Sequence, residues 1–347
     1  MSLSPIPKPT CRTEFIVNIP ENGLGEKGRG MIEMTRKNFT QGLAALSATA
    51  VSGSLFGQSH EATGDADLDL RQSEIDAVTP RDFIDYYSPG LELGDAALSA
   101  AVARFPAFGR LEAAFEKVFR EAKETIVADV NHPAVWYLYN MGLVVKTPEK
   151  MFSIDIHHRR AEEFAPLLDF ALITHNHGDH YTERFKVAMD RKEHKCVVNN
   201  FFDNYGVRDW SNGGYTRAKS KTFRFGDVTV ITGLCDHNSY LIDYTMPFEI
   251  QIGDFTIYHS GDCSNYEKLK VSRQPDLWVV HPRCGMNAVE GAREALHPKK
   301  VVLAHLQEMG HSKGRYRWTY RDGLDEKARL EESGFAAVMP LWGDRLA

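Results

Sequence analysis

A short apolar segment that runs directly into a cluster of metal-binding residue types constrains this chain more than any other feature. Residues 170–174 are typical of a buried strand, and the next six residues are His-Asn-His-Gly-Asp-His. Residues two apart on an extended segment point the same way, so His175 and His177 can reach one metal together. Asp179 and His180 follow where the chain turns into a helix, and they can face a second metal. Imidazole suits zinc, and a carboxylate also suits manganese or iron.

The chain divides into three stretches. Residues 1–65 are rich in Gly, Ser, Pro and Thr and lack strong periodicity, which predicts a disordered or signal-like segment outside the core. Residues 66–125 are expected to form a helical extension, because apolar residues such as Leu111 and Phe115 recur at helical spacing between charges. Residues 126–347 are expected to form the main domain.

Strand signals dominate this main domain. Short segments rich in β-branched or aromatic residues alternate with turn signals, of which Gly226-Asp227 and Gly253-Asp254 are typical of tight hairpins. Two strand-rich halves, each followed by helices, predict an α+β fold in which a sandwich of sheets is covered by helices. Strands are expected at residues 126–130, 135–138, 143–146, 151–156, 170–174, 196–199, 222–225, 228–232, 248–252, 255–260, 277–281, 300–304 and 336–339, and helices at 182–190, 288–296 and 320–333.

Composition narrows the classes of function. The formal net charge is -6 and no long basic run occurs, so nucleic acid is not an expected partner. No stretch approaches the roughly 20 apolar residues of a membrane-spanning helix, so no transmembrane segment is expected. The five cysteines are scattered, which argues against a disulfide framework, and Cys235 and Cys263 are expected to be small buried side chains near the metal ligands.

The segment at residues 35–57 resembles a twin-arginine export signal. The pair Arg36-Lys37 precedes Phe39 and a weakly apolar run rich in Ala, Gly and Ser, with Lys in place of the usual second Arg. Such signals begin near an N-terminus, and Met31 or Met34 would supply a suitable start. Export to the periplasm is therefore the expectation, and the alternative is a cytoplasmic protein with an N-terminal extension.

The pattern His-x-His-x-Asp-His resembles the signature of the metallo-β-lactamase-fold superfamily, and the likeness extends from about residue 126 to the end of the chain. The resemblance implies a four-layer αββα sandwich, here with an N-terminal helical extension. In that superfamily a third His completes the first metal site, an Asp bridges the two metals, and a final His completes the second site. This chain supplies His237 in Gly-Leu-Cys-Asp-His-Asn, Asp262 in Ser-Gly-Asp and His305 in Val-Leu-Ala-His.

The resemblance implies a complete two-metal ligand set. The first metal would take three histidines, the second would take an aspartate and two histidines, and Asp262 would be shared. Two divalent cations are expected, with zinc preferred over manganese or iron. By residue number, the implied ligands are His175, His177 and His237 for the first metal, Asp179, His180 and His305 for the second, and Asp262 for both.

The implied chemistry is hydrolysis of a small molecule. Two cations can hold a bridging hydroxide that attacks an ester, lactone, amide or phosphodiester, with Asp262 positioning the metals and Asp179 accepting a hydrogen bond from the nucleophile. Residues 282–305 resemble the branch that contains ascorbate-phosphate lactonase and the N-acyl phospholipid phosphodiesterase. Two alternatives stay open, a nuclease of the same fold and a non-hydrolytic di-iron or redox protein. A homo-oligomer is compatible with the sequence.

Several residues qualify this interpretation. Asp262 stands where β-lactamases of this fold commonly have Cys, which argues against penicillin-type substrates, and a strand would turn the neighbouring Cys263 away. His311 is a rival to His305, which is preferred because it ends an apolar strand. Asp155 is a candidate for orienting a ligand histidine. The remaining histidines near strand ends are expected at the solvent edge or behind the ligands, namely His157, His158, His259 and His281.

Overall fold

The computed structural model describes residues 65–87, 95–190, 196–201, 206–209, 214–216 and 220–347. These residues all belong to one compact unit of the chain. The signal-like segment expected at residues 35–57 lies outside the described residues, so the expectation of export stays a prediction. Within the described ranges, none of the helices combines the length and apolar character that crossing a bilayer requires.

Two sheets of seven strands each form the centre of the described part of the chain. The first sheet has its strands in chain order and contains β1 (Ala134–Tyr137), β2 (Leu143–Lys146), β3 (Met151–Ile154), β4 (Phe170–Ile173), β5 (Cys196–Phe201), β6 (Gly206–Asp209) and β7 (Gly214–Thr216). The second sheet has the order β16 (Ala337–Val338), β13 (Lys300–Leu303), β12 (Leu277–Val280), β11 (Phe255–His259), β10 (Phe248–Ile252), β9 (Val228–Thr232) and β8 (Thr222–Phe225).

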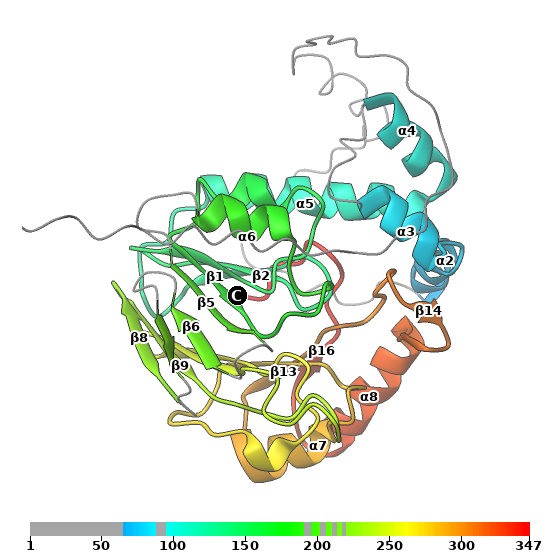
Figure 1. Cartoon of the computed structure of the whole chain (residues 1–347). Coiled ribbons are helices and arrows are strands. Elements are labelled where there is room, and N and C mark those ends of the chain that lie inside the picture. Colours follow the sequence, from blue (N-terminus) through cyan, green and yellow to red (C-terminus); the bar gives the residue numbers. More distant parts are fainter. Residues whose placement is uncertain (1–64, 88–94, 191–195, 202–205, 210–213, 217–219) are drawn as a thin grey trace, which may run out of the picture. The chain divides into compact units, whose positions relative to one another are not determined.

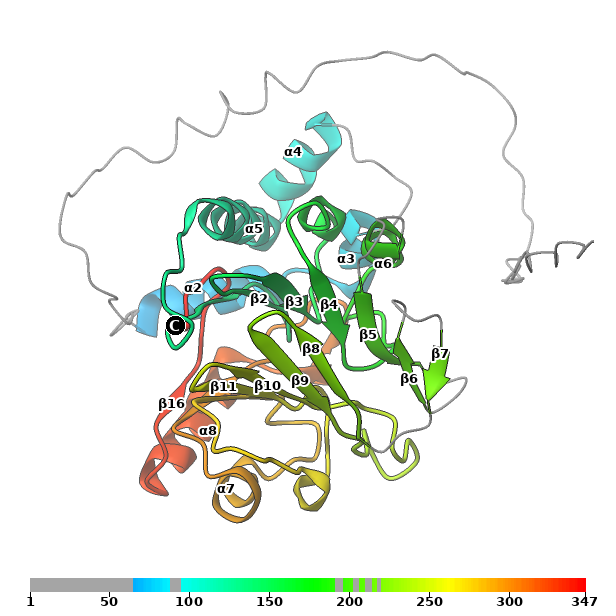
Figure 2. The ribbon, with the colours of Figure 1, turned by 90° about the vertical axis from the view of Figure 1, so that its left-hand side faces the viewer.

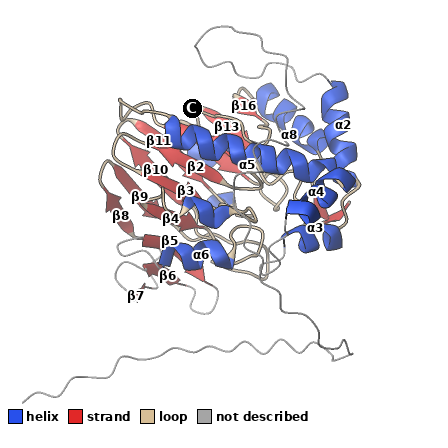
Figure 3. Ribbon diagram, turned by 90° about the horizontal axis from the view of Figure 1, so that it is seen from above, coloured by secondary structure: helices blue, strands red, loops and turns tan. Residues whose placement is uncertain are grey.

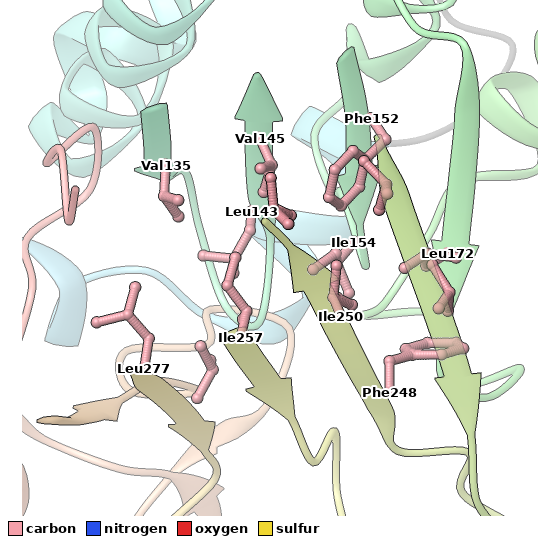
Figure 4. Packing of buried hydrophobic residues seen from close by; sticks show 14 of the residues in the cluster. Val135, Leu143, Val145, Phe152, Ile154, Leu172, Phe248, Ile250, Ile257 and Leu277 are labelled. Atoms are coloured by element: carbon pink, nitrogen blue, oxygen red, sulfur yellow. The ribbon is translucent and has the colours of Figure 1, made fainter. Parts of the chain in front are cut away.

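The hydrophobic core fills the space between the two sheets. Figure 4 shows Val135 and Ile154 of the first sheet and Ile257 and Leu277 of the second among the side chains that meet there. All four residues of β1, β3, β4 and β12 are buried, because both faces of these strands are covered. Burying this apolar surface stabilises the sandwich by roughly 25 cal/mol for each Å² removed from water.

Helices cover the outer face of each sheet (Figures 1 and 2). The first sheet is covered by α5 (Pro106–Glu124), which lies over β2 in the view from above (Figure 3), and by α6 (Glu183–Asp190). The second is covered by α7 (Ala288–Glu290), a π-helical turn at Gly291–Leu296 and α8 (Tyr320–Glu332). The predicted four-layer αββα sandwich is therefore confirmed.

Three further helices precede α5 and pack beside the sandwich. They are α2 (Asp65–Asp76), α3 (Pro80–Tyr87) and α4 (Asp95–Arg104). Proline at the first position of α3 suits a helix start, because its missing N–H would be unpaired there in any case. Buried Arg317 donates to the carbonyl oxygens of Ile75 (2.9 Å) and Val78 (2.8 Å) and so joins the end of α2 to the sandwich domain. The domain boundaries at residues 65 and 125 stay predictions.

The structure differs from the expected elements in three places. Residues 126–130 form no strand; Ile126 is 91% exposed, and Asp129 accepts from the backbone N–H of Asn131 (2.9 Å), which favours a turn. The expected helix at residues 288–296 is α-helical only up to Glu290 and then widens into the π-helical turn. Strands β6 and β7 were not expected. The remaining short elements are 3-10 turns at Ala161–Phe164 and Tyr266–Lys268 and the strand pair β14 (Ser312–Lys313) and β15 (Tyr316–Arg317).

The direction of the strands brings the loops with metal-binding side chains to one edge of each sheet. In the second sheet, β9 and β11 are both antiparallel to β10, and β11, β12 and β13 are mutually parallel. Their carboxyl ends therefore lie at the same edge. In the first sheet, β4 is parallel to its neighbours β3 and β5. The seven candidate ligands all follow the carboxyl ends of β4, β9, β11 and β13, where sites in sheets of this kind typically form.

Candidate metal centre

The loop after β4 carries four of the seven candidate ligands into the interior. His175 and His180 are completely buried, whereas His177 and Asp179 are partly buried. Gly178 lies between His177 and Asp179, and a Cβ at this position would meet nothing within 4 Å, so this part of the loop borders open space. The loop thus presents ligands inward and leaves one side accessible.

The other three candidates join this loop in two groups. His175, His177 and His237 form one group, and their rings lie 4.5 to 5.2 Å apart between centroids. Asp179, His180 and His305 form the other group, in which Nε2 of His305 lies 3.0 Å from Oδ2 of Asp179. In each group one ligand atom per residue lies within 4.8 Å of the others, which is the spacing that a single cation requires.

Asp262 lies between the two groups. Its Oδ2 atom is 3.5 Å from Nε2 of His237 and 4.0 Å from Nε2 of His175. The same carboxylate is 3.3 Å from Nε2 of His180 and 3.5 Å from Nε2 of His305. One buried carboxylate therefore contacts imidazoles of both groups, which is the arrangement expected of a residue that bridges two metals.

Unpaired buried nitrogen atoms show that the site fits metal ions. The Nε2 atoms of His175, His180 and His237 are buried and have no hydrogen-bond partner, and the same is true of Oδ1 of Asp262. An unpaired buried polar atom costs roughly 1–3 kcal/mol, so four of them in one cluster need a compensating ligand. Cations that accept lone pairs from imidazole and carboxylate would satisfy all four atoms.

The electrostatics of the site suit cation binding. Burial by itself opposes ionisation of Asp262, yet His305 and His180 hold the pKa of its carboxyl well below the usual range. Burial lowers the pKa of His175 well below its ordinary value and that of His177 to about 4. His175 and His177 are therefore neutral at pH 7, the form in which histidine binds a metal.

A single carboxylate behind the ligands orients one histidine of each group. Nδ1 of His180 donates to Oδ2 of Asp155 (2.9 Å), so its Nε2 lone pair faces the site. Nδ1 of His175 donates to Oγ1 of Thr174 (3.0 Å), and that hydroxyl donates in turn to Asp155 (2.6 Å). Asp155 has φ of 43°, a left-handed conformation held by the Thr174 N–H (2.7 Å). Its geometry matches the predicted orienting role.

Asn140 fixes the loop from the opposite side. Its side-chain amide donates to the backbone carbonyl of Asp179 (2.7 Å). The backbone carbonyl of Asn140 accepts from the backbone N–H of His305 (2.8 Å). Asn140 and His305 both have positive φ, at 56° and 57°. Asparagine tolerates this conformation well, which explains the residue type between β1 and β2. Asn140 thus joins two ligands of the second group.

Two further residues, His281 and Cys284, lie beside the candidate ligands. The ring of His281, expected only at the solvent edge or behind the ligands, stacks on His305 with centroids 4.0 Å apart and lies near Asp262. Cys284 donates to the carbonyl oxygen of Asp262 (3.2 Å) and could join His237 and Asp262 around a cation. No motif marks Cys284 in the sequence; its position after β12 was the available signal. Cys263, by contrast, is buried in the core beneath α7 and α8.

A cavity of about 340 Å³ opens next to the second group of ligands. Gly178 and Asp179 line one side of it, and Phe83, Ile84 and Tyr87 of α3 line another. His157, Glu308, Gly310 and His311 complete the lining, and among the described residues no lysine or arginine takes part. A larger cavity of about 540 Å³, between β9 and the segment at residues 267–272, contains none of the seven candidate ligands.

His305, rather than His311, lies among the candidate ligands. The nearest acidic partner of His311 is Glu308, whose Oε2 is 2.5 Å from Nδ1 of His311. Among the described residues, the groups able to hold a metal include His305 twice and His311 not at all. This geometry supports the preference for His305 that its place after an apolar strand suggested.

Comparisons with known proteins agree with this picture. The chain is 27% identical over 192 residues to a UPF0173 metal-dependent hydrolase of Symbiobacterium thermophilum, an alignment that covers 50% of this chain and 78% of the relative. A UPF0173 metal-dependent hydrolase of Staphylococcus saprophyticus is 27% identical over 120 residues, or 30% of this chain, and the match spans 49% of that relative's length. No family model matches the sequence.

The solved structures that resemble this chain are more distant in sequence. The metallo-β-lactamase fold protein YhfI of Bacillus subtilis is 13% identical, with a TM-score of 0.44 over 61% of this chain and 98% of that chain. CmlA, a diiron β-hydroxylase of Streptomyces venezuelae, is 15% identical, with a TM-score of 0.47 over 73% of this chain and 60% of that chain. The chain is similar in sequence to metal-dependent hydrolases, and its two-sheet αββα sandwich is the architecture that the resemblance to the metallo-β-lactamase-fold superfamily implied. The narrower resemblance to the ascorbate-phosphate lactonase branch stays a prediction.

Proposed function

We propose that this protein hydrolyses an ester, lactone, amide or phosphodiester bond of a small molecule with two divalent metal ions, zinc by preference. The observation that carries the proposal is the position of Asp262, which contacts imidazoles of both ligand groups within 3.3 to 4.0 Å. A site for a single metal would not need one carboxylate between two complete sets of ligands. Two adjacent groups of residues that could each hold a metal ion support the ligand set that the motif implies.

Each group of residues would have a distinct task. His175, His177 and His237 would hold one cation, Asp179, His180 and His305 the other, and Asp262 both. When bound, such a pair supplies an activated hydroxide and polarises the bond under attack. Asp179 borders the cavity, so its carboxylate can also accept a hydrogen bond from the attacking water. Asp155 and Thr174 keep the ligand rings in place while the substrate binds.

The cavity supports a small substrate over a nucleic acid. Its volume of about 340 Å³ lies at the lower end of the range for small-molecule sites. Phe83, Ile84 and Tyr87 give it an apolar wall, and within the part of the chain that the structure describes no lysine or arginine lines it to hold a phosphate backbone. We therefore favour a substrate with an apolar portion next to the bond that is cleaved.

Metal analysis combined with a substrate panel tests the proposal. We expect about two equivalents of zinc per purified chain, and metal-dependent turnover of at least one ester, lactone, amide or phosphodiester. Asp262→Asn should lose metal and lower kcat/KM by more than the roughly 10–100-fold typical for residues behind a ligand. Asp254→Asn is the matched control, since Asp254 is exposed in the turn between β10 and β11.

Three results would contradict the proposal. Full activity and two metals in Asp262→Asn would exclude the bridging role. Bound iron with a visible absorption band and no hydrolysis would favour the di-iron or redox alternative. Cleavage of RNA or DNA without turnover of any small substrate would favour the nuclease.

A further inference from the structure

We propose that His311 is a catalytic residue, the general acid that protonates the leaving group, and that Glu308 is its positioning residue. The inference rests on the proposed hydrolysis and adds the proton donor that the ligand set itself does not supply. Both residues lie in the loop between β13 and β14, and both line the cavity beside Asp179 and Gly178. His311 therefore faces the space in which the cleaved bond would lie.

Glu308 is a carboxylate buried without a metal-binding role. It is completely buried, and its Oε1 atom accepts from the backbone N–H of Gly310 (2.7 Å) and the hydroxyl of Tyr139 (3.4 Å). Its Oε2 atom lies 2.5 Å from Nδ1 of His311. A carboxylate that contacts one ring nitrogen of a histidine fixes the orientation of the ring and favours the protonated imidazole. The other ring nitrogen, Nε2, is then a proton donor.

His311 combines this support with access to the substrate. Its side chain is 38% exposed, whereas that of Glu308 is 1% exposed. The loop is held by Arg317, which donates to the carbonyl oxygens of His311 (2.8 Å) and Met309 (2.6 Å). The ring also packs edge-on against Tyr316, with centroids 5.8 Å apart. The imidazole is thus positioned by its neighbours while one side remains open to the cavity.

The other polar side chains of the cavity are poorer proton donors. Burial lowers the pKa of His157 to about 4, so its ring is neutral at pH 7. Burial raises the pKa of Tyr87 well above its ordinary value, so its hydroxyl is a weaker acid than a free phenol. Contact with Glu308 raises the pKa of His311, against an opposing effect of burial. A histidine with a raised pKa keeps its proton to a higher pH than a free imidazole and can still release it to a leaving group.

Three titratable groups, Glu308, Asp179 and His305, act on the proton of His311. Glu308 is the nearest; Asp179, across the cavity, also favours the charged ring, and His305 opposes it. The guanidinium of Arg317 contacts the backbone carbonyl of His311 rather than its ring. The carboxylate of Glu308 is the one of these groups in contact with the imidazole and is therefore the residue to change.

The proposed step balances as a hydrolysis. Hydroxide oxygen forms a bond to the carbonyl carbon, and the bond from that carbon to the leaving oxygen then breaks. The electron pair of this bond stays on the leaving oxygen, which takes the proton from Nε2 of His311 and departs as an alcohol. The neutral ring regains a proton from solvent before the next turnover. No oxidant, reductant or co-reactant other than water takes part.

A leaving-group series provides the first test. General-acid help matters for poor leaving groups such as alkoxides and little for 4-nitrophenolate. With the zinc-loaded full chain, His311→Gln should lower kcat for alkyl acetates by about 10²–10⁴-fold and leave 4-nitrophenyl acetate nearly unchanged. His132→Gln is the control, because His132 is an exposed histidine that also pairs with a carboxylate, Asp129 at 2.8 Å. Equal losses for both ester classes, or none, would overturn the proposal, as would loss of zinc from His311→Gln.

A titration of the ring provides a second test that does not need turnover. In the ¹³C-histidine-labelled, zinc-loaded protein, the signal of His311 is identified by its absence from His311→Gln. We expect a pKa above the ordinary value for histidine and a fall toward that value in Glu308→Gln. A ring that titrates normally and ignores Glu308→Gln contradicts the inference.

The two tests separate this inference from the proposed function. Loss of the two-metal stoichiometry, or a hydrolase activity that is independent of Asp262, would remove the proposed function itself. If the protein is a two-metal hydrolase and the dependence of its rate on the leaving group is unchanged in His311→Gln, the proposed function stands. Only the role of His311 as the general acid is then contradicted. If none of the acetates is turned over, the titration of His311 in the wild type and in Glu308→Gln decides.

Discussion

Asp155 illustrates at the residue scale how a side chain that binds no metal can act on both halves of the centre. It accepts directly from His180 of the second group and, through the Thr174 hydroxyl, fixes His175 of the first. In each of these rings the Nδ1 proton is therefore held in a hydrogen bond, and the Nε2 lone pair can bind a metal. If two metals bind as proposed, loss of this one acceptor should weaken the binding of both.

Asp155→Asn tests this shared support. Asparagine tolerates the positive φ of this position, so the backbone should be retained, but its amide cannot accept from both partners as the carboxylate does. We expect each metal to bind about 10–100-fold more weakly, as measured by competition with a chromophoric chelator. Asp254→Asn again serves as the control. Weakening of only one metal would show that the two groups are supported independently.

The sequence could predict the candidate ligands but not the groups around the cavity. The candidate ligands could be predicted because they follow apolar strands and match an ordered motif, from His175 to His305. Glu308 and Tyr87 belong to no motif, and their meeting depends on how a loop packs against a helix more than 200 residues away. His311 was visible as a histidine but could be interpreted only as a rival ligand. Its carboxylate partner gives it a different chemistry.

At the scale of elements, Arg317 joins the helical extension to the loop that carries Glu308 and His311. Its guanidinium donates to four backbone carbonyls, two at the end of α2 and two in the loop that carries Glu308 and His311. The residue is 2% exposed, so these acceptors have little access to water when the side chain is lost. The position of α3, and thus the apolar wall of the cavity, depends on this junction.

Arg317→Met should therefore weaken both stability and substrate binding. A buried carbonyl that loses its donor costs roughly 1–3 kcal/mol. Because Arg317 serves several carbonyls, we expect the free energy of unfolding to fall by several times this amount. KM should rise more than kcat falls, since α3 lines the cavity but supplies no candidate ligand. Denaturant unfolding and steady-state kinetics measure the two effects. Arg315→Met, at an exposed position two residues earlier, should change neither, and equal behaviour of the two variants would contradict the junction.

Secondary structure was predictable where periodicity and turn chemistry agree. The helix expected at residues 182–190 is α6 (Glu183–Asp190), and the turn at Gly253-Asp254 joins β10 to β11 as predicted. Gly253 has φ of 54°, a conformation that favours glycine. The strand expected at residues 126–130 is absent because β-branched residues there have no neighbouring strand to pair with. The strand preference of individual residues cannot predict whether a neighbouring strand is present.

At the scale of the whole molecule, the stability of the fold should depend on pH through buried histidines. His158 is completely buried, stacks on Phe115 with centroids 4.3 Å apart, and has its pKa lowered to about 3 by burial. The unfolded chain takes up a proton below about pH 6.5, whereas the folded chain does not until about pH 3. Stability due to this residue is therefore complete above pH 6.5 and is lost as the pH falls.

Replacing His158 with Phe isolates this effect. The variant keeps an aromatic ring against Phe115 and removes the titrating group, so its unfolding free energy should fall less steeply with acid. The expected difference in slope is about 1.4 kcal/mol per pH unit between pH 6 and pH 4. Denaturant unfolding at several pH values measures it, and effects of metal release are common to both proteins. Parallel curves would show that His158 does not govern the acid sensitivity.

The wall that α3 contributes to the cavity has a consequence for how such a protein can diversify. Phe83, Ile84 and Tyr87 come from a helix ahead of the sandwich, whereas every candidate ligand comes from loops within it. Ile84 is 52% exposed, so it can be exchanged at little cost to packing. We therefore expect exchanges at Ile84 to alter the preference for a substrate while every candidate ligand stays in place, so that recognition and chemistry can vary separately.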